Sequence, residues 1–200
     1  MGSGALRCLV LGREPSGESH TLLTLLEAEE GLVRCLIRPS RRAGVAQPDI
    51  FDEAEVTLEK SSGGANRFVR EYRALQRLPG LGKSHTALER ASRLAGIIRR
   101  NPPPPESAPV AFQIARETLH AMADRPRPDA AYVKALWLLL KDGGWPVEAD
   151  WLGRLGSRRE IATGVLSQPL DAQSASTADV QDLAQDLERW AVGEVHYVLP

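Results

Sequence analysis

Residues 17–42, GESHTLLTLLEAEEGLVRCLIRPSRR, decide how the first part of the chain folds. Two apolar runs flank a turn at Glu30-Gly31, and the second run ends in a cluster of arginines. Short apolar runs bounded by turn residues are typical of β-strands. The run 21–26 would also suit a short helix, but its length and its β-rich partner at 32–37 favour a strand. The stretch therefore predicts a strand pair that brings positive charge to one edge of a small sheet.

Three more segments have strand character. The run 5–11 is apolar and precedes turn residues at 14–17, while 50–60 alternates between apolar and polar residues. A Ser-Ser-Gly-Gly loop then leads into a last run, 66–75. Five short strands with turn signals between them predict a small closed or partly open barrel.

The rest of the chain has helical periodicity. Thr86 with Glu89 has the spacing of a capping box, and Asp129 and Ser176 precede two further helices. Asn101 and four prolines separate the first helix from the next. The segment 130–141 is apolar around most of its circumference and should be the most buried helix. We expect helices at residues 86–100, 107–123, 130–141, 147–155, 158–166 and 176–193, with a polar loop before the last and an extended tail after it.

The charge is unevenly distributed. The formal net charge of the chain is −1, but residues 60–100 contain ten Lys and Arg against Glu71 and Glu89. A segment with this excess of positive charge would attract a polyanion. The alternative is a solvated face whose arginines pair with the acidic flanking segments.

Candidate nucleic-acid contacts lie on two neighbouring elements. Arg38, Arg41 and Arg42 follow the strand at 32–37, and Arg67, Arg70, Arg73 and Arg77 lie on or after the last strand. Arginine suits bidentate phosphate contacts and stacking on bases. Phe68 and Tyr72 are four residues apart on a strand and would share one face, forming a stacking platform. The alternative for both aromatic residues is a place in the barrel core.

Several function classes lack their motifs. The chain has no G-x-S-x-G, Gly-rich phosphate loop, H-E-x-x-H or C-x-x-C sequence, and its four histidines are scattered, so we expect no enzyme. Cys8 and Cys35 are expected to be buried, reduced residues. Because no long apolar run or leader pattern is present, we expect a soluble cytoplasmic protein, with any nucleoid association following from DNA binding.

The order of these elements resembles the RecO family of bacterial recombination mediators. The resemblance rests on Gly17-Glu18-Ser19, the leucine-rich strand, Glu30-Gly31-Leu32-Val33-Arg34, and the arginine-rich exit, followed by an alternating strand and a second basic strand. It continues into the helical part, where 87–99 and LWLLLKDGGWPVEADWL occupy the places of the family's first connecting helix and of its Leu-rich helix and turn.

The resemblance implies an α+β protein, with a five-stranded OB-fold-like barrel in residues 1–80 and an all-helical domain in 81–200. It implies binding and annealing of single- and double-stranded DNA, without a cofactor. It also implies recombinase loading together with a RecR-like mediator and single-strand-binding protein. Many members carry a four-cysteine zinc module, which two cysteines cannot build, so we expect no zinc. The alternative functions are a protein-interaction adaptor that uses the helical domain, with the barrel as a scaffold, and an unrecognised hydrolase.

Overall fold

The computed structural model describes residues 4–39, 46–60 and 67–200, which form two compact units. The barrel unit is Met1–Leu78 with Pro102–Gln113, and the helical unit is Pro79–Asn101 with Ile114–Pro200. Residues 102–113 thus return to the barrel unit. A Cβ atom at Gly31 would lie 3.1 Å from the Pro103 carbonyl oxygen, so this segment packs on the turn between two strands of the barrel.

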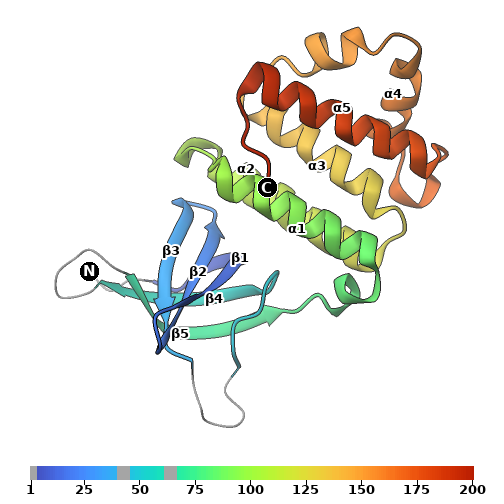
Figure 1. Ribbon diagram of the computed structural model, residues 1–200. Helices are drawn as coiled ribbons and strands as arrows, with labels where there is room; N and C mark the ends of the chain where they lie inside the picture. The colour runs from blue at the N-terminus through green and yellow to red at the C-terminus, as the bar shows by residue number, and fades with distance from the viewer. Residues whose placement is uncertain (1–3, 40–45, 61–66) are drawn as a thin grey trace. The chain divides into compact units, whose positions relative to one another are not determined.

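Five antiparallel and parallel strand pairings close the barrel (Figure 1). The strands run around it in the order β1-β2-β3-β5-β4, and β4 pairs with β1 to complete the circle. The expected five-stranded barrel followed by helices is therefore confirmed, and its form is compatible with an OB-fold-like barrel. The strand bounds are β1 Leu6–Ser16, β2 His20–Glu27, β3 Gly31–Ile37, β4 Glu53–Lys60 and β5 Arg67–Gln76.

The strand expected at 21–26 is confirmed as β2, and two boundaries differ from expectation. The turn expected at 14–17 lies later, because β1 continues to Ser16 and Gly17 takes the turn with φ 62°. The strand expected from residue 50 begins at Glu53. Asp52, just before it, is buried and accepts a hydrogen bond of 3.0 Å from the backbone N–H of Asp49, which closes a turn in place of the first strand residues.

Three β-bulges interrupt the strands. One, in β5, leaves Leu75 extra between Ala74 and Gln76, and the other two change which face of the barrel the later residues occupy. In β1, Val10 pairs with Leu25 and Gly12 with Thr24, so Leu11 is an extra residue. In β5, Val69 pairs with Leu58 and Glu71 with Thr57, so Arg70 is extra. A bulge bends its strand and inverts the alternation that follows it. Both inversions affect residues considered below.

The barrel core is built from the inward residues of the strands. Leu23, Leu25, Val33, Val56 and both cysteines belong to one buried cluster. Cys8 and Cys35 are free thiols, which confirms the expectation that they are buried. Burial raises the pKa of each to about 12, and therefore keeps both thiols protonated at neutral pH.

The helical unit packs around α3 (Figure 1). Tyr132, Val133, Leu136 and Leu140 of α3 are fully buried, as expected for the most apolar helix, although Leu138 is 42% exposed. The helices are α1 His85–Arg100, α2 Ala108–Asp124, α3 Pro128–Asp142, α4 Arg159–Ser167 and α5 Thr177–Val195, and α2 gives its first residues to the barrel unit. Short helical turns occupy Pro79–Lys83, Pro105–Ser107, Glu148–Leu152, Gly156–Arg158 and Leu170–Ala172.

The helix starts confirm one of three expected caps. Ser176 caps α5 as expected, accepting a 3.1 Å hydrogen bond from the Asp179 N–H. At α1 the cap is Ser84 rather than Thr86, since its hydroxyl accepts from the Ala87 N–H. Asp129 lies inside α3, whose cap position is Arg127 with φ 65°. The carboxylate of Asp129 accepts hydrogen bonds from that arginine instead of from the helix backbone.

A buried ionic contact joins three helices of this unit. Glu188 of α5 accepts two hydrogen bonds from Arg93 of α1 and one of 2.6 Å from the Tyr132 hydroxyl of α3. Burial opposes the charged form of Glu188, but these hydrogen bonds outweigh it and lower its pKa. Burial and the nearby carboxylate raise the pKa of Tyr132. In the described part of the chain, no helix has both the length and the apolar character that a membrane span requires.

Candidate nucleic-acid interface

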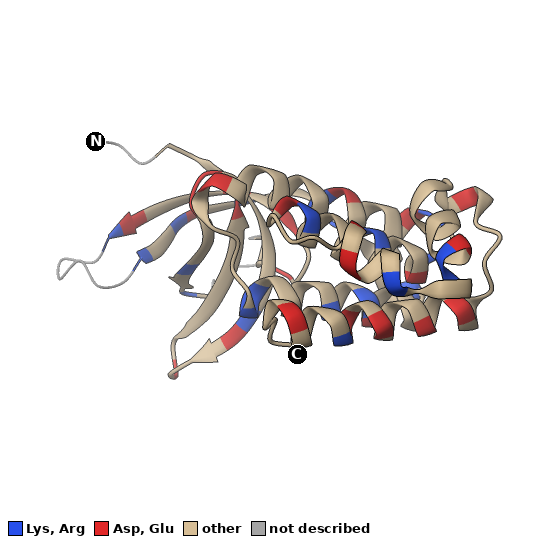
Figure 2. Ribbon diagram, turned by 90° about the horizontal axis from the view of Figure 1, so that it is seen from above, with Lys and Arg blue, Asp and Glu red and all other residues tan. Residues whose placement is uncertain are grey.

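The arginines predicted to contact nucleic acid do not form one set. Arg38 lies directly after β3 and is exposed, and Arg67, Arg70 and Arg73 lie on β5, with Arg77 just beyond it. Arg41 and Arg42 lie outside the described residues. Figure 2 shows Lys and Arg interleaved with Asp and Glu along both strands and helices.

Three of the predicted arginines pair with acidic residues of the barrel. Arg67 binds Glu30, and Arg73 binds Glu55 across the β4–β5 pair. The Nε atom of Arg77 lies 3.6 Å from a carboxylate oxygen of the buried Asp52. These pairs match the alternative of arginines neutralised by acidic partners. Exposed pairs contribute little to stability, but they reduce the local positive potential.

Four barrel arginines lack such partners. Arg38 and Arg70 are exposed, and so are Arg13 and Arg34, which were not among the candidate contacts predicted from the sequence. Among the residues that the structure describes, none of the four forms an ion pair. Arg70 is the extra residue of a β5 bulge. These four arginines, with the exposed Lys60 at the end of β4, are therefore available cations of the described barrel surface.

The stacking platform proposed for Phe68 and Tyr72 is wrong. The bulge at Arg70 lies between the two aromatic residues and places them on opposite faces of β5. Tyr72 pairs with the core residue Val56 and packs against the barrel core, as its alternative predicted. Its hydroxyl donates a 2.6 Å hydrogen bond to Asp52. Burial is the main cause that raises the pKa of Tyr72, and this hydrogen bond raises it further.

The unpaired arginines Arg13 and Arg38 border one cleft of about 760 Å³. Its walls are the end of β1, the β1–β2 turn, the start of β2 and the chain leaving β3. The polar residues of this cleft, called the hairpin cleft below, are Arg13, Glu18, Ser19, His20, Thr21 and Arg38. Two arginines against one glutamate give it a net positive charge.

His20 is held in place at the wall of the hairpin cleft. Its Nδ1 shares a 2.9 Å hydrogen bond with the Ser19 hydroxyl. Its ring meets the ring of Phe68 edge-on, with 5.8 Å between the ring centres. Phe68 therefore supports a cleft residue from behind, although it does not pair with Tyr72. Sequence reasoning missed His20 because a single histidine in a strand has no distinguishing pattern.

A smaller cleft of about 480 Å³ lies beside Arg13 on the same barrel. It is lined by residues 46–49, Ala74 and Arg77, and Arg13 lines it as well as the hairpin cleft. Arg77 donates a 3.0 Å hydrogen bond to the Gln47 carbonyl oxygen, which fixes its guanidinium at the cleft wall. We call this the Arg77 cleft.

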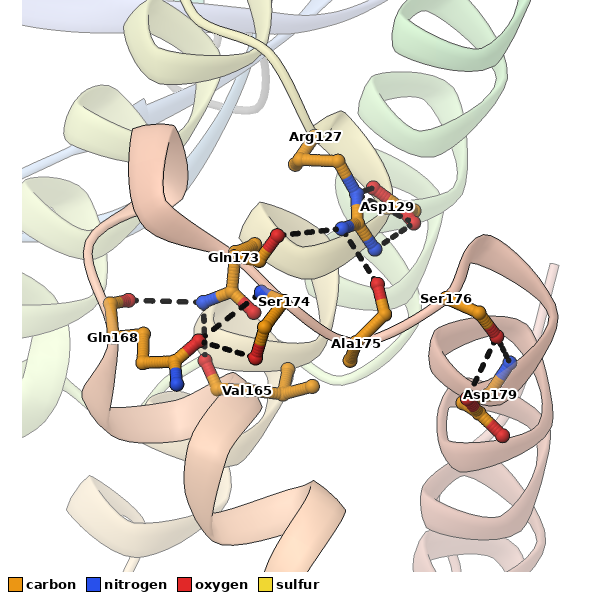
Figure 3. Close-up of polar contacts among 9 residues, drawn as sticks. All are labelled: Arg127, Asp129, Val165, Gln168, Gln173, Ser174, Ala175, Ser176 and Asp179. Atoms are coloured by element: carbon orange, nitrogen blue, oxygen red, sulfur yellow. Dashed lines mark hydrogen bonds and ion pairs between the residues drawn. The ribbon is translucent and has the colours of Figure 1, made fainter.

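The largest cleft of those described, about 1240 Å³, belongs to the helical unit. It lies between α4 and the start of α5, and Figure 3 shows the polar contacts at one side of it. Arg127 donates to Asp129 and to the Ala175 carbonyl, and Gln173 donates to the carbonyls of Val165 and Gln168. Hydrogen bonds thus hold the segment that was expected to be a polar loop, and the segment contains a helical turn at Leu170–Ala172.

Charge separates this helical cleft from the barrel clefts. Arg159 is accompanied there by Glu160 and Asp179, so the helical cleft carries no excess of positive charge. A polyanion would favour the hairpin cleft in spite of its smaller volume. Among residues 4–39, 46–60 and 67–200, no three His, Cys, Asp or Glu side chains gather in a way that could hold a metal ion.

No protein-family profile matches this chain, and no curated protein matches it. The candidate interface therefore rests on the geometry and charge of the barrel unit.

Proposed function

We propose that this protein binds DNA without catalysis and acts as a mediator of recombinational repair, as its resemblance to the RecO family implies. The observation that carries the proposal is the hairpin cleft with its two unpaired arginines, Arg13 and Arg38. In this reading the barrel captures single-stranded DNA through its phosphates, and the helical unit contacts the partner proteins of the pathway.

The position of the hairpin cleft supports this function. OB-type barrels bind oligonucleotides over the β2–β3 face and the loops that follow β1 and β4. The hairpin cleft contains the β1–β2 turn at Gly17 and Ser19, the start of β2 and the exit of β3. The chain thus has a cleft of positive charge where this barrel architecture commonly binds nucleic acid.

The structure changes which arginines the proposal relies on. Arg38 stays a candidate, Arg13 joins it, and Arg70 is exposed on β5. Arg67 and Arg73 become weaker candidates, because each already has a carboxylate partner. A phosphate would have to compete with that partner before it could bind.

The test is a titration of a fluorescently labelled single-stranded oligonucleotide with purified full-length protein. Arg38→Ala should weaken binding several-fold, whereas Arg73→Ala should change it little. Both residues are exposed barrel arginines, but only Arg73 has an ion-pair partner. Equal effects of the two variants would contradict the assignment of the hairpin cleft.

Absence of binding at low salt would reject DNA binding altogether and favour the adaptor function. In that case a stable protein partner should be recovered from nuclease-treated lysate, and the helical unit should supply all contacts with that partner. The proposed partners, a RecR-like mediator and single-strand-binding protein, can be tested by co-elution with the full-length chain in the presence and absence of DNA.

A further inference from the structure

The hairpin cleft and the Arg77 cleft share one residue, Arg13. Arg38 borders one of them and Arg77 the other, so a cationic side chain lies in each cleft with Arg13 between them. Two recesses that share a cationic lining residue can both be contacted by one flexible polyanion. A duplex is far stiffer and cannot follow two successive recesses of this size.

The orientation of Arg13 follows from the bulge in β1. If Leu11 were paired regularly in the ladder, Arg13 would alternate to the face opposite Cys8 and Val10. Because Leu11 is instead the extra residue of a bulge, Arg13 pairs with Leu23, a residue of the barrel core cluster. Directly paired residues of antiparallel strands point to the same face. The bulge therefore turns Arg13 to the inner side of the sheet, where the Arg77 cleft also contains the inward residue Ala74.

The Arg77 side chain is positioned in advance. It contacts Asp52 at 3.6 Å and the Gln47 carbonyl at 3.0 Å, yet 53% of the side chain stays exposed. A guanidinium has five N–H donors, so donors remain for an oxygen ligand after these contacts. The contact with Asp52 reduces the positive potential of Arg77. The fixed position of the guanidinium, however, lowers the side-chain entropy that is lost when a ligand binds.

The lining of the two clefts indicates which part of a strand is recognised. Of the described residues that line them, His20 alone has an aromatic ring. The other lining residues are arginines, prolines, small or polar residues, and one acidic residue in each cleft, Glu18 and Asp49. Single-strand binders that rely on bases use aromatic side chains for successive bases. Two arginines per cleft and a single ring match recognition of phosphates more closely than recognition of bases.

We propose that one DNA single strand occupies both clefts, crosses over Arg13, and is held mainly through its phosphates. This inference rests on the proposed function and adds the route of the strand, the central role of Arg13, and a binding mode that does not depend on sequence. It also predicts that Arg77 contacts only the part of the strand that extends past Arg13 into the Arg77 cleft.

Two measurements test the route. In a series of oligothymidylates of increasing length, affinity should rise until the strand spans both clefts and then level off. Arg13→Ala should weaken binding at every length, whereas Arg77→Ala should weaken binding several-fold only for strands long enough to reach the second cleft. Arg73→Ala is the matched control at each length. Because Asp52 loses a partner in Arg77→Ala, Arg77→Lys provides a second variant that keeps a positive charge beside that carboxylate.

A third measurement tests the binding mode. An oligonucleotide of abasic sites keeps the phosphates and lacks the bases, and it should bind within about threefold of oligothymidylate. A loss of tenfold or more would show that bases dominate and would overturn the phosphate mode. Normal binding of all oligonucleotides by Arg13→Ala would overturn the route while leaving the proposed function intact. Failure of the unaltered protein to bind any oligonucleotide would reject the proposed function itself.

Discussion

Arg93 of α1 donates two hydrogen bonds, of 2.6 and 2.5 Å, to the two carboxylate oxygens of Glu188 of α5. Only 7% of the Glu188 side chain is exposed, so the carboxylate depends on this partner and on Tyr132. Removing one member of a buried ion pair leaves an uncompensated charge. Arg93→Ala should therefore lower the free energy of unfolding by about 3 kcal/mol.

Chemical denaturation measures this loss. The matched control is Arg154→Ala, which breaks an exposed pair with Glu194 whose side chains are 52% and 57% exposed. The control should change the free energy of unfolding by less than about 1 kcal/mol. A similar loss of unfolding free energy in both variants would show that the buried pair stabilises the protein no more than the exposed pair does.

The stability should decrease in acid. The pKa of Glu188 in the folded protein lies below its ordinary value of 4.5, so the unfolded chain binds the proton more readily. The stabilisation from this group is fully present above pH 4.5 and is lost as the pH falls through the lower, folded-state pKa. Denaturation midpoints measured between pH 7 and pH 3 should fall more steeply for the unaltered protein than for Glu188→Gln.

Two neighbouring glycines should respond oppositely to alanine. A Cβ atom at Gly80 would lie 2.2 Å from the backbone carbonyl oxygen of Ala123, and backbone cannot yield cheaply. Gly80→Ala should therefore destabilise the protein by about 1–3 kcal/mol or more. Gly82, two residues later, has open space around it, and its alanine variant should be neutral or more stable by up to about 1 kcal/mol. Thermal melting compares the pair, and equal melting temperatures would contradict the close approach.

The two thiols should be inert in the folded protein. A pKa of about 12 leaves a very small thiolate fraction at pH 8, and the thiolate is the reactive form. A thiol reagent should label Cys8 and Cys35 slowly in buffer and rapidly in denaturant. Rapid labelling of the folded protein would show that the barrel opens readily.

The salt dependence of DNA binding should report three phosphate contacts. If Arg13, Arg38 and Arg77 each neutralise one phosphate, the logarithm of the binding constant should fall with the logarithm of salt concentration with a slope of about −2. Arg13→Ala should reduce the magnitude of that slope by about 0.7. An unchanged slope in this variant would place Arg13 outside the contact.

The sequence predicted the barrel strands and most helices because alternation, periodicity and turn residues are local signals. The run before Glu30 could be assigned to β2 from its short length and its β-rich partner, which is the run after Gly31 that forms β3. Helix starts were less accurate, since Ser84 and Thr86 are both suitable cap residues two positions apart.

The candidate site was predicted less well than the fold. The pairing of Arg73 with Glu55 joins residues on different strands, and their contact depends on the register of β4 and β5. The separation of Phe68 from Tyr72 depends on a bulge at Arg70, which carries no glycine or other sequence signal. Arg13 was missed because a single arginine in an otherwise acidic segment does not stand out.

The extra residue Leu11 also determines on which face of β1 each later side chain lies. From Gly12 onward, the odd-numbered residues lie on the face that the even-numbered Cys8 and Val10 occupy before the bulge. Deletion of Leu11 would remove the bulge and leave Arg13 opposite Leu23, because Val10, Gly12 and Arg13 would then alternate regularly. An insertion of one further residue between Val10 and Arg13 that joined the ladder would instead move Arg13 to the opposite face.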